Sequence, residues 1–430
     1  MFDHAFTVII LYEMAGELKN KVRALLDSRR PPSKALALFF NAPVLLCTVF
    51  RVVIALGFWL NALSLLVSKM RSFEWKAHFL LCALFLSIIE EKVMMQQFAI
   101  TFDDVLMVPG YNHYESRRLV DTTMTDRNGK LTLALPVMSS NMDTVTESAM
   151  ANFMASKGGI GVLHRFMTIE ENIAEFKKCV SSVFVSIGCN QSELERAKAL
   201  HDAGANYFCI DVAHAHAKYV GNTLKELRKL LPEACIMAGN VATYAGADYL
   251  ASCGADIIKA GIGGGSVCST RIKTGFGIPM LTCIQDCARC DRSIVADGGI
   301  RTAGDIVKAL AFGADFVMIG GMLAGTAVTP GKVITHSDGR KVKQYRGMAS
   351  REAQEDFMGG MHEWKTAEGV ATEVAYREDQ DIILGDIIGG LRSGLTYAGS
   401  STIRELQRKL DYVVVTPAGR VESLPHKTLA

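Results

Sequence analysis

Short runs of apolar and β-branched residues recur from about residue 130 onward, and a stretch with helical spacing follows each of them. A strand followed by a helix, many times over, predicts βα units around a parallel sheet. The runs are residues 135–141, 159–164, 183–188, 207–213, 235–242, 257–263, 293–299 and 316–321. Eight units close a (β/α)8 TIM barrel, so we expect an α/β fold of this class over residues 95–430.

Helical patterns between the runs support this fold. Residues 192–203 and 219–231 carry apolar side chains three and four positions apart, as helices on the outside of a barrel should. Polar residues and glycines gather where the expected strands end, at positions 139–143, 211, 240, 263–268, 297–299 and 320–321. A glycine after a strand is ordinary turn chemistry, but in a TIM barrel these ends carry the active site.

Residues 1–94 have a different pattern. Residues 42–67 are apolar except for Arg51 and Asn61, and residues 78–89 form a second apolar run. The uncharged part, residues 52–68, is at the lower limit of a membrane-spanning helix. Three interpretations remain open: a membrane tether, a helix pair packed on the main domain, or an extension missing from the working protein. We expect the last, because a start at Met94 or Met95 would give a complete barrel chain.

Composition narrows the class of protein. The net charge of +2 over 430 residues lacks the excess of basic residues that a nucleic-acid-binding protein needs. The 11 cysteines are scattered and no secretory signal precedes them, which predicts reduced thiols in the cytosol. Cys287 and Cys290 have the spacing of metal ligands, but no second pair completes a site. We therefore expect Cys283, Cys287 and Cys290 on successive turns of one helix.

The loops after the last three strands carry candidate chemistry. Barrels often bind phosphate in the loops after strands 7 and 8, which here hold Asp297-Gly298-Gly299 and Gly320-Gly321. The loop after strand 6 reads GIGGGSVCSTR over residues 261–271. It offers Ser266 to a phosphate and presents Cys268 near Arg271, so Cys268 is a candidate nucleophile.

Several long motifs, in order, resemble the IMP dehydrogenase/GMP reductase family over about residues 98–415. They are GGGSVCST at 263–270, TFDDVL at 101–106, SNMDTV at 140–145, DGG at 297–299 and FVMIGGMLAG at 316–325. The resemblance implies a purine-nucleotide barrel, usually a homotetramer, whose loop cysteine attacks C2 of the base while a nicotinamide cofactor exchanges hydride there. It also implies a potassium ion on the carbonyls of Gly263, Gly265 and Cys268, with Arg271 closing the site.

The family that the chain resembles has two branches, the dehydrogenases and the reductases. Family dehydrogenases carry an Arg-Tyr pair on a mobile flap to activate water, and residues 349–367 contain none. The chain also lacks the regulatory domain that most dehydrogenases insert after strand 2, and it has the reductase-like Arg271-x-Lys273. Against this, residues 211–216 and 144–147 are closer to dehydrogenase sequences, and Gly264 replaces a common proline.

We expect NADPH-dependent reduction of GMP to IMP with release of ammonia through a covalent thioimidate on Cys268, with Thr270 and Glu368 as proton relay. The alternatives are an NAD-dependent IMP dehydrogenase without the regulatory domain, forming XMP, or a catalytically silent nucleotide-binding barrel. By family position, the GMP contacts are Ser266, Asp297, Gly298, Gly299, Gly320, Gly321, Gly347 and Met348. The cofactor contacts are Ser116, Arg117, Arg165, Asp211, Val212, Ala213, Ser393 and Thr396. The guanidinium groups suit a 2′-phosphate, which favours NADPH.

Overall fold

A computed structural model describes residues 98–360 and 363–425. The apolar segment of residues 42–89, and with it all three interpretations of residues 1–94, lies outside the described residues. Within the described ranges, no helix combines the length and apolar character needed to span a membrane.

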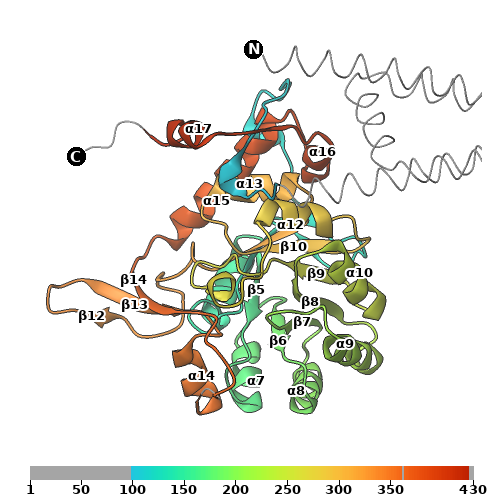
Figure 1. Cartoon of the computed structure of the whole chain (residues 1–430), viewed down its shortest axis with the longest axis vertical. Coiled ribbons are helices and arrows are strands. Elements are labelled where there is room, and N and C mark those ends of the chain that lie inside the picture. Colours follow the sequence, from blue (N-terminus) through green and yellow to red (C-terminus); the bar gives the residue numbers. More distant parts are fainter. Residues whose placement is uncertain (1–97, 361–362, 426–430) are drawn as a thin grey trace, which may run out of the picture. The chain divides into compact units, whose positions relative to one another are not determined.

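Eight parallel strands close into a barrel in the order β10-β11-β4-β5-β6-β7-β8-β9, which confirms the expected fold (Figure 1). Each strand falls within one of the eight predicted apolar runs. The strands are β4 (Val137–Ser139), β5 (Ile160–Leu163), β6 (Phe184–Ile187), β7 (Tyr207–Asp211), β8 (Cys235–Val241), β9 (Ile257–Ala260), β10 (Ser293–Asp297) and β11 (Phe316–Ile319).

Helices follow the strands and surround the barrel (Figure 1). They are α6 (Ser148–Ser156), α7 (Ile169–Lys177), α8 (Gln191–Asp202), α9 (Lys218–Leu230), α10 (Tyr244–Cys253), α12 (Met280–Cys287) and α13 (Ala303–Ala311), with the short α11 (Thr270–Thr274) before α12. Both predicted helices are confirmed as α8 and α9. Helix α9 buries Val220, Leu224 and Leu227, the three- and four-residue spacing that the sequence showed.

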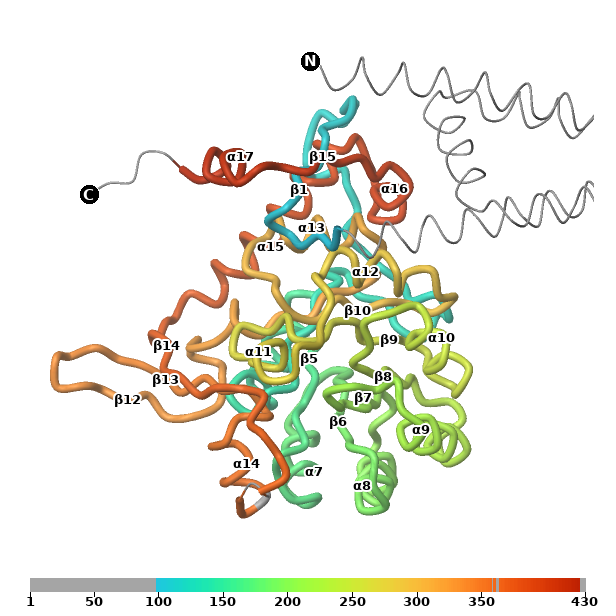
Figure 2. The backbone as a smooth tube through the Cα atoms, viewed as in Figure 1, coloured from blue at the N-terminus to red at the C-terminus, as the bar shows by residue number. Residues whose placement is uncertain are grey.

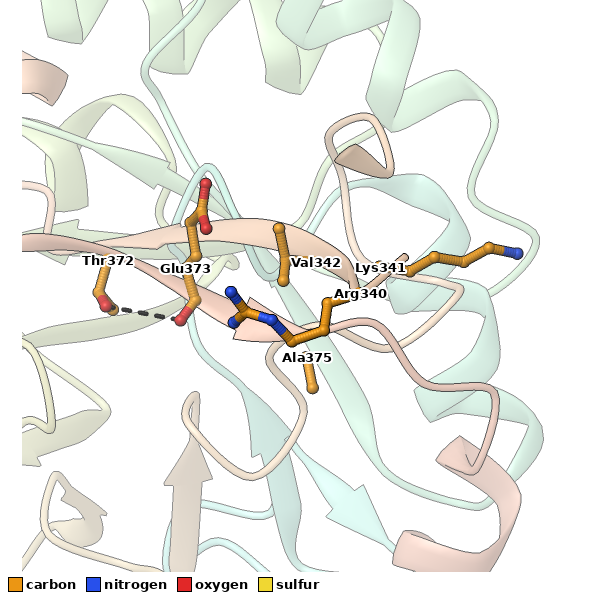
Figure 3. Close-up of a pocket in the computed structure, with 6 residues that line it drawn as sticks. All are labelled: Arg340, Lys341, Val342, Thr372, Glu373 and Ala375. Carbon is orange, nitrogen blue, oxygen red and sulfur yellow. Dashed lines mark hydrogen bonds between the residues drawn. The ribbon is translucent and has the colours of Figure 1, made fainter. Parts of the chain in front are cut away.

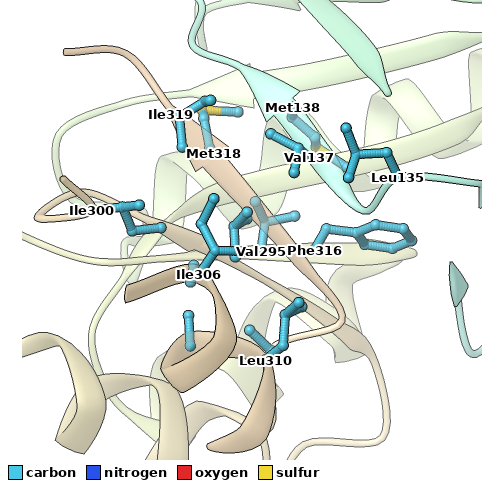
Figure 4. Close-up of a cluster of buried hydrophobic side chains, with 14 of the residues drawn as sticks. Leu135, Val137, Met138, Val295, Ile300, Ile306, Leu310, Phe316, Met318 and Ile319 are labelled. Atoms are coloured by element: carbon cyan, nitrogen blue, oxygen red, sulfur yellow. The ribbon is translucent and has the colours of Figure 1, made fainter. Parts of the chain in front are cut away.

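The barrel core is made of strand side chains that have no access to solvent. Val137, Val295 and Phe316 are fully buried where β4, β10 and β11 meet, and Ile306 and Leu310 of α13 cover them from outside (Figure 4). Strands covered on both faces are mostly apolar, which explains their nearly continuous hydrophobic runs. Each such side chain contributes roughly 1.5–3 kcal/mol on burial.

Segments outside the barrel complete the chain. Two strands far apart in the sequence form an antiparallel pair, β1 (Val105–Met107) with β15 (Tyr412–Val414) (Figure 2). After β11 an antiparallel sheet projects from the barrel, and α14 follows its middle strand. The elements are η1 (Phe102–Asp104), η2 (Arg117–Leu119), β2 (Met124–Thr125), β3 (Thr132–Leu133), β12 (Ile334–Thr335), β13 (Lys341–Arg346), α14 (Arg351–Met358), β14 (Ala371–Ala375), α15 (Gln380–Tyr397), α16 (Ile403–Arg408) and α17 (Pro417–Glu422).

The cysteines of the described ranges are all free thiols. The expectation of three thiols on one helix was wrong in part. Cys283 and Cys287 lie on α12, but the helix ends at Cys287 and Cys290 lies in the turn beyond it. Among the described residues, no group of three or more His, Cys, Asp or Glu side chains could hold a metal ion.

Candidate active site

The loop that carries Cys268 leaves the end of β9 and packs against the loop after β10. Gly261 has a φ of 139°, and a Cβ there would stand 2.0 Å from the carbonyl oxygen of Asp297, so only glycine allows this approach. Gly298 has a φ of 110°, and its Cβ position is 3.0 Å from the backbone of Gly264. The glycines that the sequence grouped at strand ends therefore bring two loops into backbone contact.

Cys268 has one side-chain partner in its own loop. Its thiol donates to Thr270 Oγ1 at 3.2 Å, and the Thr270 hydroxyl donates to Glu368 Oε2 at 2.8 Å. The donors run in one direction, from thiol through hydroxyl to carboxylate. These two hydrogen bonds can move the thiol proton to Glu368 and return a proton along the same path.

Backbone pairing holds Glu368 beside the cysteine loop. Ser269 N–H donates to the carbonyl of Glu368 at 2.9 Å, and Val370 N–H donates to the carbonyl of Val267 at 2.9 Å. The two segments thus form a short antiparallel bridge at Cys268. No local pattern in the chain predicts this pairing between residues about 100 positions apart.

A second group of predicted residues gathers around Ser266. Its hydroxyl is 2.8 Å from Tyr345 Oη, and a Cβ on Gly321 would stand 3.0 Å from Ser266 Oγ. The Tyr345 hydroxyl is also near the Cβ position of Gly320, at 3.5 Å. Hydroxyls of Ser266 and Tyr345 over two bare glycine backbones form a cradle that suits a phosphate. Burial raises the pKa of Tyr345, which keeps it a neutral hydrogen-bond donor.

The predicted pair Gly347-Met348 adjoins this cradle. Met348 Sδ accepts the N–H of Asp143 at 3.3 Å, and the Cβ position of Gly347 is 3.2 Å from the carbonyl of Val267. The segment after β13 therefore touches both the cysteine loop and the loop after β4. It closes one side of the site.

Three of the predicted strand-end residues and one unpredicted lysine form the floor of the site. Lys259 donates to Asp211 Oδ1 at 2.6 Å and to Asp297 Oδ2 at 2.9 Å. Asn240 Nδ2 donates to the same Asp297 oxygen at 2.9 Å. Burial disfavours the Asp211 carboxylate, but the Lys259 ammonium outweighs it and holds the pKa of Asp211 below its ordinary value. The two predicted aspartates are thus joined through a lysine.

Half of the predicted cofactor residues lie at this end of the barrel. Val212 N–H donates to the carbonyl of Gly239 at 3.0 Å, which extends β7 beyond Asp211. Arg165, after β5, stacks over Phe166 and is near enough to Asp211 to stabilise its charge.

The other predicted cofactor residues lie elsewhere. They are Ser116, Arg117, Ser393 and Thr396. Ser116 caps η2, which contacts α15, and Ser393 and Thr396 lie on the last turns of α15. Arg404, just beyond, pairs with Asp315 immediately before β11, so this region is at the N-terminal ends of the strands. Within one chain, these four residues are not brought together with Cys268.

The predicted cation site consists of neutral backbone oxygens. The carbonyl of Gly265 accepts the N–H of Cys268 at 3.1 Å, and the side chain of Arg271 lies against Gly263. Arg271 donates to the carbonyls of Ile262 at 3.4 Å and Ile278 at 2.8 Å, so its guanidinium ties the two ends of the loop. Uncharged carbonyls without carboxylates fit a weakly held monovalent ion better than a divalent one.

A pocket elsewhere contains none of the predicted residues. It lies on the projecting sheet and is lined by Arg340, Lys341, Val342, Thr372, Glu373 and Ala375 (Figure 3). Arg340 directly precedes β13 and Lys341 begins it, and Thr372, Glu373 and Ala375 lie on β14. Figure 3 shows Lys341 pointing away from the other five residues. The chemistry remains with the Cys268 loop.

Comparison with known proteins gives matches over about three quarters of this chain. Residues 99–426 match the family model described as IMP dehydrogenase / GMP reductase domain. GMP reductase 2 of Homo sapiens is 37% identical over 73% of this chain and 94% of its own length. A solved structure described as inosine 5′-monophosphate dehydrogenase from Legionella pneumophila is 78% identical, with a TM-score of 0.70 over 75% of this chain and 100% of that chain. A GMP reductase from Trypanosoma brucei, a cysteine-to-alanine form in complex with guanosine 5′-monophosphate, is 29% identical, with a TM-score of 0.72 over 77% of this chain and 98% of that chain.

Proposed function

The chain belongs to the IMP dehydrogenase/GMP reductase family, and from this premise we propose that it is a GMP reductase that converts GMP to IMP with NADPH. The observation that carries the proposal is the line of hydrogen bonds from Cys268 through Thr270 to Glu368. It supplies the two proton movements that reductive deamination needs.

The first step uses this line as a base. Glu368 takes the thiol proton through the Thr270 hydroxyl, and the Cys268 thiolate adds to C2 of GMP. The C2–S bond forms as the C2–N3 π bond opens, and N3 takes a proton. Geometry favours Cys268 as nucleophile because its thiol is partly exposed and already bonded to the relay.

The second step uses the line as an acid. The 2-amino group is a very poor leaving group until it is protonated, so Glu368 returns a proton through Thr270. The C2–N bond breaks, ammonia leaves and a thioimidate on Cys268 remains. NADPH, when bound, supplies the hydride that goes to C2. The C2–S bond then breaks, N3 releases the proton that it took up, and the departing thiolate is protonated again. GMP, NADPH and a proton have then become IMP, NADP⁺ and ammonia.

The flap supports the reductase over the dehydrogenase. A dehydrogenase must hydrolyse its covalent intermediate and needs a group that activates water. The flap of residues 349–367 holds no Arg-Tyr pair. Its helix α14 faces the barrel with Phe357, whose ring packs on Phe166 with centroids 4.9 Å apart. An aromatic contact of this kind does not activate water.

IMP dehydrogenase is the second candidate function. The 78% identity to a chain described as an inosine 5′-monophosphate dehydrogenase favours it, as do the residues 211–216 that resemble dehydrogenase sequences. The catalytically silent barrel has no such support, because the relay at Cys268 is complete.

The remaining assignments belong to the same proposal. Ser266, Gly320 and Gly321 would hold the GMP phosphate, with Gly298, Gly299, Gly347 and Met348 lining the nucleotide and Asp297 binding the ribose hydroxyls. Arg165 and residues 211–213 would contact NADPH, and the carbonyls of Gly263, Gly265 and Cys268 would hold K⁺. Ser116, Arg117, Ser393 and Thr396 would reach a cofactor from a second chain of a homotetramer. Free cysteines suit the cytosol.

A direct assay separates the two functions. The purified full chain is incubated with GMP and NADPH, and with IMP and NAD⁺, and nicotinamide absorbance and ammonia are followed. We expect NADPH oxidation with one ammonia released per NADPH. Formation of NADH from IMP, without activity on GMP, would show that the chain is a dehydrogenase. Nucleotide binding without turnover of either pair would show a silent barrel.

A further inference from the structure

The lysine in the floor of the site lies between carboxylates that serve different ligands in the proposed function. The Lys259 side chain is 3% exposed, whereas those of Asp211 and Asp297 are 26% and 21% exposed. The ammonium is therefore shielded from solvent beneath the site. Both carboxylates still have surface that a ligand can reach.

The lysine stem cannot shift easily. Lys259 is in the middle of β9, and a Cβ added at Gly239 of β8 would stand 2.5 Å from Lys259 Cβ. Neighbouring backbone thus closes around the start of the side chain. On the Asp297 side, Asn240 donates both to Asp297 Oδ2 at 2.9 Å and to the carbonyl of Gly261 at 2.6 Å. One oxygen of Asp297 is used by Lys259 and Asn240, which leaves Oδ1 for a ligand.

The charges in the floor depend on this ammonium. Burial disfavours the charged amine, but Asp211 and Asp297 outweigh it and raise the pKa of Lys259 above its ordinary value. The other titratable groups that face the cluster are the thiols of Cys209 and Cys189, whose pKa values burial raises to about 12 and about 11, the Tyr345 hydroxyl near Asp297, and Arg165, which stabilises Asp211. None of these groups replaces Lys259 between the two carboxylates.

We propose that Lys259 is a positioning residue that holds the Asp211 and Asp297 carboxylates together through its two hydrogen bonds, so that the nucleotide and cofactor halves of the site depend on one buried charge. The inference rests on the proposed function for the assignment of Asp297 to the ribose hydroxyls and Asp211 to the cofactor. Without the ammonium, two like charges would face each other at close range. Such a pair shares a proton at a pH where each carboxyl alone would be ionised.

The test uses Lys259→Met in the full chain. Dissociation constants for GMP without cofactor, and for NADPH without GMP, are measured by calorimetry from about pH 6 to pH 9. We expect both constants to rise at least tenfold. The loss should grow as the pH falls, because a shared proton removes the acceptor that binds the ribose hydroxyls. The GMP phosphate titrates near pH 6 in both proteins, so the ratio of variant to wild type isolates the carboxylates.

Two variants separate positioning from general destabilisation. Lys259→Arg keeps the positive charge, so the ratio of its dissociation constants to those of the wild type should not depend on pH. Lys343→Met removes another buried ammonium, one that donates to the carbonyls of Thr326 at 3.1 Å and Thr329 at 2.6 Å and to no carboxylate in the described ranges. The thermal stability of the Lys343→Met variant should fall, but the ratio of its dissociation constants to those of the wild type should not depend on pH. If Lys259→Met does not fold, Lys259→Gln, which keeps donors but removes the charge, is measured instead.

Unchanged dissociation constants in Lys259→Met would overturn the proposal. So would a loss that is the same at every pH and matches that of Lys343→Met. Binding of IMP and NAD⁺ is measured in parallel. If the chain proves to be a dehydrogenase, the proposed function fails, while the same comparison with these two ligands still decides the role of Lys259.

Discussion

Thr270 donates a hydrogen bond of 2.8 Å to Glu368, although 98 positions separate them in the chain. Thr270 begins α11 directly after the cysteine loop, and Glu368 directly follows the flap of residues 349–367. The bond therefore links the cysteine loop after β9 to the segment before β14, which lies outside the eight barrel strands.

The first prediction concerns this relay. Glu368→Gln keeps the shape of the side chain but removes its ability to exchange a proton. We expect kcat for GMP reduction to fall by about 10²–10⁴, the usual contribution of a general acid–base, with little change in GMP affinity. Steady-state kinetics and calorimetry measure the two quantities. Glu352→Gln, an exposed position on α14, is the matched control and should keep wild-type kcat. A Glu368→Gln enzyme with wild-type kcat would remove the relay from the mechanism.

The second prediction concerns thiol selectivity. Burial raises the pKa of Cys179 and of Cys189 to about 11, and that of Cys209 to about 12, so these thiols are poor nucleophiles near neutral pH. We expect iodoacetamide to alkylate Cys268 first and to abolish activity in step with that label. Bound GMP should slow both the alkylation of Cys268 and the loss of activity. Peptide mapping by mass spectrometry identifies the labelled residue.

A cysteine variant completes this test. Cys268→Ala should have no measurable turnover while GMP binding persists, because the phosphate cradle around Ser266 does not involve the thiol. Activity loss that followed alkylation of a different cysteine would argue against Cys268 as nucleophile.

Much of the barrel could be predicted because each strand is a separate apolar run whose length and spacing are local properties. The cysteine loop could be predicted equally well, because the glycines at 263–265 are consecutive in the chain. Lys259 was missed because it lies inside the apolar run of residues 257–263, where it reads as one more strand position. Its partners, Asp211 and Asp297, are 48 and 38 positions away. Only closure of the barrel brings the three side chains together.

Tyr345 was missed for a related reason. It lies on β13, outside the eight strands that predict strand-end chemistry. Strand β13 of the projecting sheet brings Tyr345 next to the loops after β9 and β11. No periodicity in the sequence predicts this contact. A clue was available in Gly347-Met348, two positions later, which the family resemblance already assigned to the nucleotide.

The third prediction tests Tyr345 in the phosphate cradle. Tyr345→Phe removes the hydroxyl that lies 2.8 Å from Ser266 Oγ, in a side chain that is 5% exposed. A hydrogen bond of this kind contributes about 0.5–1.5 kcal/mol, so we expect GMP affinity to fall by roughly two- to tenfold with kcat nearly unchanged. Tyr376→Phe is the control, because its hydroxyl bonds Glu378 at 2.7 Å away from the cradle. Equal affinities in Tyr345→Phe and wild type would exclude the hydroxyl from nucleotide binding.

The fourth prediction concerns the arginine that joins the flap helix to the barrel. Arg346 donates through Nε at 2.9 Å and Nη2 at 2.6 Å to Asp143 Oδ2, and through Nη1 at 2.5 Å to Asp356 on α14. The side chains of Arg346 and Asp143 are 11% and 12% exposed, whereas that of Asp356 is 67% exposed. The two ion pairs share one guanidinium but lie in very different surroundings.

Their energetic contributions should differ accordingly. Arg346→Met leaves the Asp143 carboxylate nearly buried without its partner, so we expect the free energy of unfolding to fall by about 3–5 kcal/mol. Asp356→Asn breaks a solvent-exposed pair and should cost about 1 kcal/mol or less, an effect that salt reduces further. Urea unfolding of both variants at low and high salt measures these values. If Asp356→Asn is as destabilising as Arg346→Met, then α14 is part of the structural core, and it could not open as a flap while the barrel stays folded.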